Sequence, residues 1–216
     1  MPGEVADIAL MTDSLGLRDS SSKTAALSSA SVIERAKAGD AAGFEELIDC
    51  YQRKVLSTSW RMLGNREDAQ DAAQEVFLRV HKYLTGFRSD QDFAAWLYRI
   101  IVNVCRDHLR KRRDRHQFAS FESERETGTL EALMSGEDIE ANAIKSQQRS
   151  LIAEALDTLS TKERAALVLR DLEGLSTEEV ARILGSSQTT VRTQISSARA
   201  KIKQYRDRVM NRTQRG

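Results

Sequence analysis

The sequence is poor in proline and in aromatic residues: its 216 residues include one Pro, six Phe, four Tyr and two Trp. Alternating runs of β-branched and polar residues are almost absent, whereas Ala, Leu, Glu, Arg and Gln are abundant. The abundant residues favour helices, and the missing pattern is the one that indicates strands. The composition therefore predicts an all-α protein and argues against an enzyme built on a β-sheet.

Long apolar runs are missing as well. No run approaches the roughly 18 residues that a membrane-spanning helix needs. The N-terminus has no charged start followed by an apolar core, which is the pattern of a signal peptide. We therefore expect no membrane insertion and a cytoplasmic protein.

Cysteine and histidine are scarce. Cys50 and Cys105 lie 55 residues apart within apolar helical patterns, and the three histidines form no ligand spacing with them. Burial of both thiols is the expected outcome, and a zinc site is not expected. Because glycine-rich phosphate loops, nucleophile elbows and clustered carboxylate pairs are also lacking, we expect no catalytic residue, metal or cofactor.

Charge is strongly segregated, although the formal net charge is only +1. Residues 96–116 hold seven Arg or Lys against two Asp, and residues 182–216 hold nine basic residues against one Asp. Between them, residues 117–140 hold seven acidic residues against one Arg. Because neutralised phosphates release counterions, two basic blocks flanking an acidic connector predict two sites for a polyanion. Charge balancing for solubility explains the sum of the charges but not their order.

The most informative stretch is 175–203, LSTEEVARILGSSQTTVRTQISSARAKIK. Ser176 and Glu179 form a capping box that starts a short helix, and Gly185 is placed to end it. A second helix is expected from Gln188, with an apolar stripe on one face and polar and basic residues on the others. This pattern is typical of a helix-turn-helix whose second helix enters the major groove. An ordinary helical hairpin with a solvated basic face is the alternative.

Further caps divide the rest of the chain. A capping box at Ser31 predicts that the first helix begins there, and Asp40 is expected to cap the next helix. Gly64 should end that helix, and Ser160 should start another. The expected helices cover residues 31–39, 40–63, 66–84, 92–113, 142–158, 161–172, 177–184 and 188–208. The expected organisation is a disordered or weakly ordered tail (1–30), a first helical domain (31–115), a flexible acidic linker (116–141), a second helical domain (142–208) and a basic tail (209–216).

Two segments, in this order, resemble regions 2 and 4 of the bacterial extracytoplasmic-function sigma factors, group IV of the sigma-70 family. The first contains FEELIDCYQRKVLSTSWRMLGNREDAQDAAQEVFLRVHKYL and FAAWLYRIIVNVCRDHLRKRRDR, and the second is LDTLSTKERAALVLRDLEGLSTEEVARILGSSQTTVRTQISSARAKI. The resemblance covers about residues 32–115 and 142–205. It implies a non-catalytic subunit that binds core RNA polymerase and directs promoter recognition, DNA melting and transcription initiation. An anti-sigma factor commonly restrains this family.

The resemblance assigns capture of the -10 element to the loop 85–92 and the helix that follows. One base of the single strand is flipped into a pocket of that loop, so preformed groups must offset the cost of unstacking it. Asn103 is the strongest candidate for a base-edge contact, whereas Trp96 is expected in the core. The candidate -10 residues are Phe87, Arg88, Ser89, Tyr98, Arg99, Asn103, Arg106, Arg110, Arg112 and Arg113.

The same resemblance assigns polymerase binding and -35 recognition. Region 2 clamps the polymerase β′ coiled coil, and region 4 binds the β flap and duplex -35 DNA. The residues at the matching β′-binding positions are Asp71, Gln74, Glu75 and Phe77. The candidates for -35 contact are Gln188, Thr189, Arg192, Thr193 and Ser196 in the groove, and Arg199 and Lys203, with Lys201, closer to phosphates.

This chain departs from the family where Gln194 replaces a residue that is often basic, and small hydroxyls stand at Ser196 and Ser197. A lost bidentate arginine contact is worth roughly 1 to 3 kcal/mol of discrimination, so no particular -35 sequence can be carried over. The acidic linker is expected to run through the polymerase cleft toward the RNA exit path.

Two other functions remain open from the sequence. A dimeric helix-turn-helix regulator would bind duplex DNA without polymerase, but it needs a symmetric operator and leaves the first basic block unexplained. A helical adaptor would have no affinity for DNA.

Overall fold

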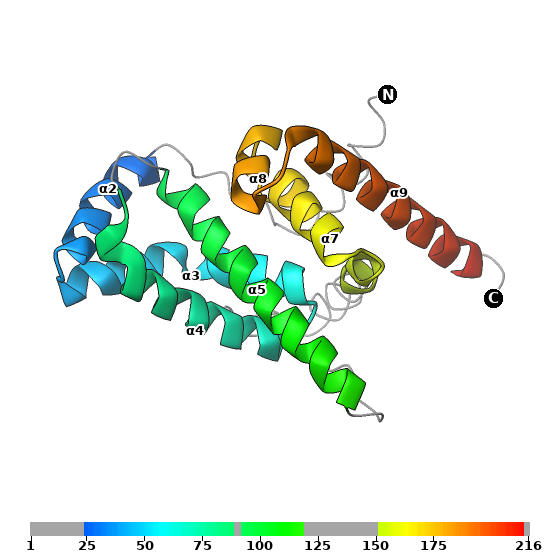
Figure 1. Cartoon of the computed structure of the whole chain (residues 1–216), viewed down its shortest axis with the longest axis horizontal. Coiled ribbons are helices and arrows are strands. Elements are labelled where there is room, and N and C mark those ends of the chain that lie inside the picture. The colour runs from blue at the N-terminus through cyan, green and yellow to red at the C-terminus, as the bar shows by residue number, and fades with distance from the viewer. Residues whose placement is uncertain (1–23, 89–91, 119–150, 214–216) are drawn as a thin grey trace.

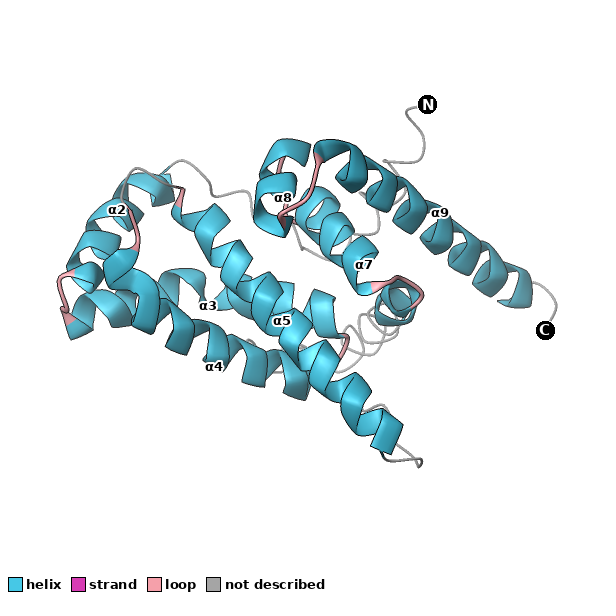
Figure 2. Ribbon diagram, viewed as in Figure 1, coloured by secondary structure: helices cyan, strands magenta, loops and turns pink. Residues whose placement is uncertain are grey.

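The computed structural model describes residues 24–88, 92–118 and 151–213. Within these ranges every regular element is helical and there is no strand (Figure 2). The elements are α2 (Thr24–Lys37), α3 (Ala41–Leu63), α4 (Arg66–Tyr83), the 3₁₀ turn η1 (Leu84–Gly86), α5 (Phe93–Phe118), a helix over residues 151–157, α7 (Thr161–Leu167), the π-helical turn η3 (Val168–Leu172), α8 (Thr177–Leu184) and α9 (Gln188–Thr213).

The helices form two lobes (Figure 1). In the first lobe, α3 packs against α2, α4 and α5. In the second lobe, which holds residues 151–157 and α7 to α9, both α7 and α8 pack against α9. The lobes touch where α5 meets α8 and where α3 meets α7 and η3, and one cluster of buried apolar side chains continues from one lobe into the other. The prediction of two small helical domains is confirmed, and the two domains are in direct contact.

Several predicted caps are present. Asp40 Oδ1 accepts a hydrogen bond from Ala42 N at 3.0 Å, which starts α3, and Gly64 ends that helix with φ 80°. Both capping boxes of the second lobe form, at Ser160 for α7 and at Ser176 for α8. Each cap satisfies amides or carbonyls that the helix itself leaves unpaired.

The predicted helix start at Ser31 is wrong. Helix α2 begins at Thr24, so Ser31 lies inside the helix, and residues 24–30 of the expected tail are helical. The segment TAALSSA contains helix-forming Ala and Leu and no helix-breaking residue, which allows the helix to extend upstream of the cap signal. For the same reason α5 and α9 continue past their expected ends, to Phe118 and Thr213. Most of the predicted acidic linker, residues 119–141, lies outside the described residues.

The two cysteines differ in burial. Cys105 is fully buried, as predicted, and desolvation raises the pKa of its thiol to about 12. Cys50 is exposed, so the prediction of its burial is wrong. Cys50 lies only three residues after the buried Leu47, so the helical period alone does not distinguish it from a core position.

No helix in the described ranges combines the length and apolarity that crossing a membrane requires. Among the same residues, no three His, Cys, Asp or Glu side chains gather closely enough to hold a metal ion.

Candidate DNA and polymerase interfaces

The start of α9 presents a polar surface to solvent. Ser187 caps the helix, with Thr190 N donating to its Oγ at 3.1 Å. Val191, Ile195 and Ala198 are buried against the rest of the second lobe and fix which face of α9 is outward. The exposed side chains include six of the predicted -35 residues: Gln188, Thr189, Arg192, Thr193, Ser196 and Lys203.

Two basic residues further along α9 are held within the second lobe. Arg199 pairs with Asp171 through two hydrogen bonds of 2.9 and 2.8 Å, and Lys201 Nζ lies 2.8 Å from Glu163 Oε2. Hydrogen bonds from Lys201, Ser197 and the Ser160 cap lower the pKa of Glu163 to about 2. In this conformation Arg199 links α9 to η3 and Lys201 links α9 to α7, so both cations already have an acidic partner.

The predicted -10 surface on α5 is only partly exposed. Arg99, Asn103, Arg110 and Arg113 face solvent, and Arg106 and Arg112 are partly buried. Tyr98 is 2% exposed, and its hydroxyl donates to Glu173 Oε2 at 2.7 Å. Burial, together with the charge of Glu173, raises the pKa of Tyr98 far above its usual range, so the phenol stays a donor.

The loop before α5 is anchored by aromatic packing. Phe87 is 5% exposed, and its ring lies 5.3 Å from Phe93 and 5.1 Å from Trp96, between centroids. Trp96 packs against the core as predicted. The Phe87 ring is therefore part of the core under the loop and is not available to stack on a base in this structure. Arg88 is exposed, and Ser89 lies outside the described residues.

The predicted polymerase-binding residues on α4 fall into two groups. Asp71 and Gln74 are exposed, whereas Glu75 is partly buried and Phe77 packs against the core. Leu78, four residues after Gln74 and on the same side of the helix, is 71% exposed. The sequence analysis did not single out Leu78, although its place outside the buried stripe of an amphipathic helix could be read from the helical period.

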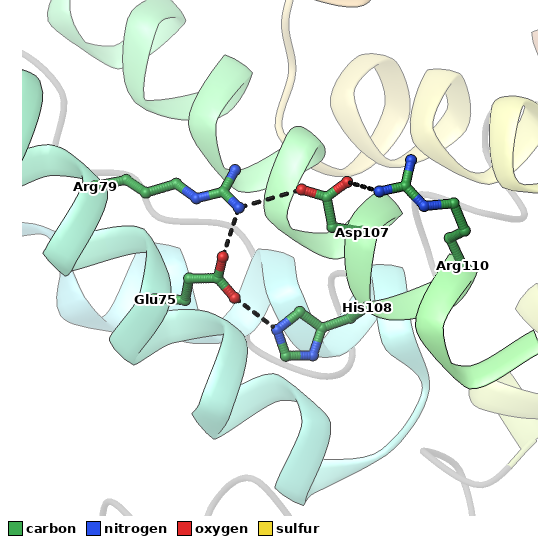
Figure 3. A network of polar contacts seen from close by, with 5 residues as sticks. All are labelled: Glu75, Arg79, Asp107, His108 and Arg110. Carbon is green, nitrogen blue, oxygen red and sulfur yellow. Dashed lines mark hydrogen bonds and ion pairs between the residues drawn. The ribbon is translucent and has the colours of Figure 1, made fainter. Parts of the chain in front are cut away.

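Glu75 belongs to a network that joins α4 to α5 (Figure 3). Arg79 bridges Glu75 and Asp107, and His108 Nε2 lies 3.1 Å from the other Glu75 oxygen. Asp107 also accepts from Arg110 at 3.2 Å. Partial burial opposes ionisation of Glu75, but the hydrogen bonds from Arg79 and His108 outweigh it and lower the pKa of Glu75. The network fixes the register of the predicted polymerase-binding helix against the predicted DNA-binding helix.

Known proteins match both lobes. Residues 47–115 match the family Sigma-70 region 2, and residues 149–202 match Sigma-70, region 4. The chain is 34% identical over 173 residues to the RNA polymerase sigma-H factor of Pseudomonas aeruginosa. The aligned residues cover 79% of this chain and 90% of that protein. It is 30% identical over 178 residues to the ECF RNA polymerase sigma factor SigW of Bacillus subtilis, covering 81% of this chain and 95% of SigW.

Solved structures show the same architecture. CnrH in complex with the cytosolic domain of CnrY matches with a TM-score of 0.59 and 26% identity, covering 82% of this chain and 96% of that one. The sigma factor RpoE of Bartonella quintana, in complex with the anti-sigma factor NepR, matches in fold with a TM-score of 0.61 at 20% identity, covering 76% and 96% of the two chains. The sequence matches, in the predicted order, show that the chain belongs to the extracytoplasmic-function sigma factors of the sigma-70 family.

Proposed function

We propose that this sigma factor directs initiation through three surfaces: the exposed face of α4 for core polymerase, α5 with its preceding loop for the -10 element, and the start of α9 for the -35 element. The observation that carries the proposal is the outward polar face of α9. Six predicted -35 residues are exposed there, while the apolar stripe between them is buried. A helix with this arrangement can dock on its own lobe and still read a major groove.

The polymerase surface combines Asp71, Gln74 and Leu78 on one side of α4. Carboxylate and amide oxygens suit a partner rich in arginine, and an exposed leucine adds apolar area at the centre of the contact. The counterpart is expected to be the β′ coiled coil for the first lobe and the β flap for the second. With these assignments we expect the protein to act with polymerase in the cytoplasm, in a binding role and not a catalytic one.

A regulatory protein partner is also expected. The related CnrH was solved in complex with the cytosolic domain of a second protein, CnrY. By analogy we propose that an anti-sigma factor restrains this chain until a stress signal releases it.

The test is reconstituted transcription with core polymerase on a promoter library. The expected result is a set of transcripts that start from promoters sharing -10 and -35 elements and that require the sigma factor. Specific binding to duplex DNA by the chain alone, with no transcript from any promoter when core is added, would instead indicate a helix-turn-helix regulator.

A further inference from the structure

Tyr83 is an exposed aromatic residue at the end of α4. Its side chain is 52% exposed, whereas every other Phe, Tyr or Trp whose side chain the structure describes is buried or half-buried. The two aromatic residues predicted for -10 capture are among the buried ones, since Phe87 is 5% exposed and Tyr98 is 2% exposed. Tyr83 therefore offers the most accessible aromatic ring of the described residues.

The position of Tyr83 in the chain links it to the predicted -10 surface. It ends α4 immediately before η1 and the loop that the family resemblance assigns to the -10 element. Lys82 Nζ lies over its ring, 5.3 Å from the centroid, and Arg88, two residues beyond η1, is exposed. Surfaces that bind single-stranded nucleic acid combine such groups, because aromatic faces stack on bases while cations attract phosphates.

The contacts between α4 and α5 place Tyr83 along the pair of helices (Figure 3). Three ion pairs join these helices: Asp68 with Arg112, Glu75 with His108, and Arg79 with Asp107. The helices are therefore antiparallel, because the partner on α5 moves back as the residue on α4 advances. Tyr83 lies one turn after Arg79 on the same side of α4. The facing turn of α5, one turn before Asp107, holds the exposed Asn103.

We propose that Tyr83 stacks on an unpaired base of the nontemplate -10 strand, next to the base that Asn103 contacts. This role rests on the proposed function of α5 and its preceding loop, and it assigns to Tyr83 the stacking that the buried Phe87 does not provide. Melting costs the strand its own base stacking, and an accessible ring replaces part of it. Because every base has a π face, Tyr83 stabilises the open strand without requiring a particular base.

Two substitutions separate stacking from other roles of Tyr83. Tyr83→Leu removes the aromatic face and keeps an apolar side chain, whereas Tyr83→Phe keeps the ring and loses only the hydroxyl. His81→Ala is the control, because His81 is an exposed ring of the same helical turn that packs edge-on against Phe44, 5.0 Å between centroids. Residues two apart on a helix do not face the same way. Circular dichroism and thermal denaturation check that each variant is folded.

The measurement uses each variant assembled with core polymerase. The probes are single-stranded oligonucleotides of the nontemplate strand, taken from a promoter that the library experiment identifies. Their affinity is titrated at several salt concentrations. A second set carries 2-aminopurine at one -10 position at a time, because the emission of this base falls when it stacks on an aromatic ring.

Tyr83→Leu should bind the oligonucleotide about tenfold more weakly than the parent, within the range observed when a stacking residue is lost. Tyr83→Phe and His81→Ala should bind like the parent. The loss should be the same at every salt concentration, because stacking releases no counterions. In Tyr83→Leu alone, 2-aminopurine should become brighter at one position, which identifies the stacked base.

Equal affinities of the parent and Tyr83→Leu would overturn the proposal. An equal loss in Tyr83→Phe would also overturn it, since the hydroxyl would then be the group that binds, and so would a loss confined to low salt. Failure of the proposed function looks different, because the parent then starts no transcript from any promoter and this inference fails with it. Failure of the inference alone leaves transcription by the parent intact.

Discussion

Arg199 of α9 donates two parallel hydrogen bonds to Asp171 of η3, from Nε to Oδ2 at 2.9 Å and from Nη2 to Oδ1 at 2.8 Å. The side chain of Asp171 is 10% exposed and that of Arg199 is 33% exposed. Bidentate pairs of this kind are the geometrically specific ones among ion pairs. An arginine that sequence reasoning assigned to DNA phosphates is thus engaged inside the second lobe.

Arg199→Ala should therefore lower stability more than it alters DNA binding. We expect a loss of about 1 kcal/mol in the free energy of unfolding, since the pair is partly screened by solvent. The exposed Lys203 is the comparison: Lys203→Ala should reduce the salt dependence of promoter binding by about one counterion and lower stability less than Arg199→Ala does. Urea denaturation and binding titrations at several salt concentrations measure the two effects. A reduced salt slope with unchanged stability in Arg199→Ala would show that Arg199 contacts phosphate instead.

Glu163→Gln should destabilise the second lobe in a pH-dependent way. The pKa of Glu163 is lowered from 4.5 to about 2 in the folded protein by Lys201, Ser197 and its own cap, so its carboxylate stabilises the fold above pH 4.5. That contribution is lost as the pH falls from 4.5 toward 2, because in this range the unfolded state binds the proton and the folded state does not. At pH 7 we expect a loss of about 1–3 kcal/mol. Urea denaturation between pH 7 and pH 3 should show the parent and variant converging; a constant difference would contradict the role of the charge.

Gly43→Ala should lower the stability of the first lobe. A Cβ added at Gly43 would lie 2.8 Å from Arg35 Cβ and 3.1 Å from Ala36 N, where α3 crosses α2. The helices must then move apart, which we expect to cost about 1–3 kcal/mol. Gly86→Ala is the control, because nothing lies within 4 Å of the Cβ position there. Thermal denaturation of the two variants compares them, and equal melting temperatures would show that the contact relaxes freely.

Leu78→Ala should weaken binding to core polymerase without affecting the fold. Leu78 is 71% exposed, so its truncation removes little buried area from the free protein. As an apolar contact beside Asp71 and Gln74, it should contribute about 1–2 kcal/mol to the complex. Met210→Ala removes another exposed apolar side chain, on α9, and should bind core normally. Equilibrium titration of labelled protein with core polymerase distinguishes the two, and equal affinities would remove Leu78 from the interface.

The local features of this protein follow from short stretches of sequence. The capping boxes at Ser160 and Ser176 involve residues three apart, and the turn at Gly185 needs only a left-handed residue after the last apolar position. Likewise, the buried Val191 and Ile195 are spaced at the helical repeat, so the outward face of α9 could be read from the pattern. Such features depend on interactions within one or two helical turns, which is why they could be predicted.

The state of individual functional side chains was decided by tertiary structure. Glu173 meets Arg61 and Thr58 from 112 and 115 residues away, and no local pattern marks an acid after an apolar helix as the centre of a lobe contact. The family resemblance implies that Tyr98 is a -10 residue, yet its hydroxyl donates its hydrogen bond to the same carboxylate. The sequence by itself determined most of the helices and the caps at Asp40, Gly64, Ser160 and Ser176, because these depend on near neighbours, and its resemblance to a known family identified the two domains. Only the packing of the helices, within each lobe and between the lobes, decided which charged and polar groups are engaged, because a buried charge must find its partner wherever the fold brings one within reach.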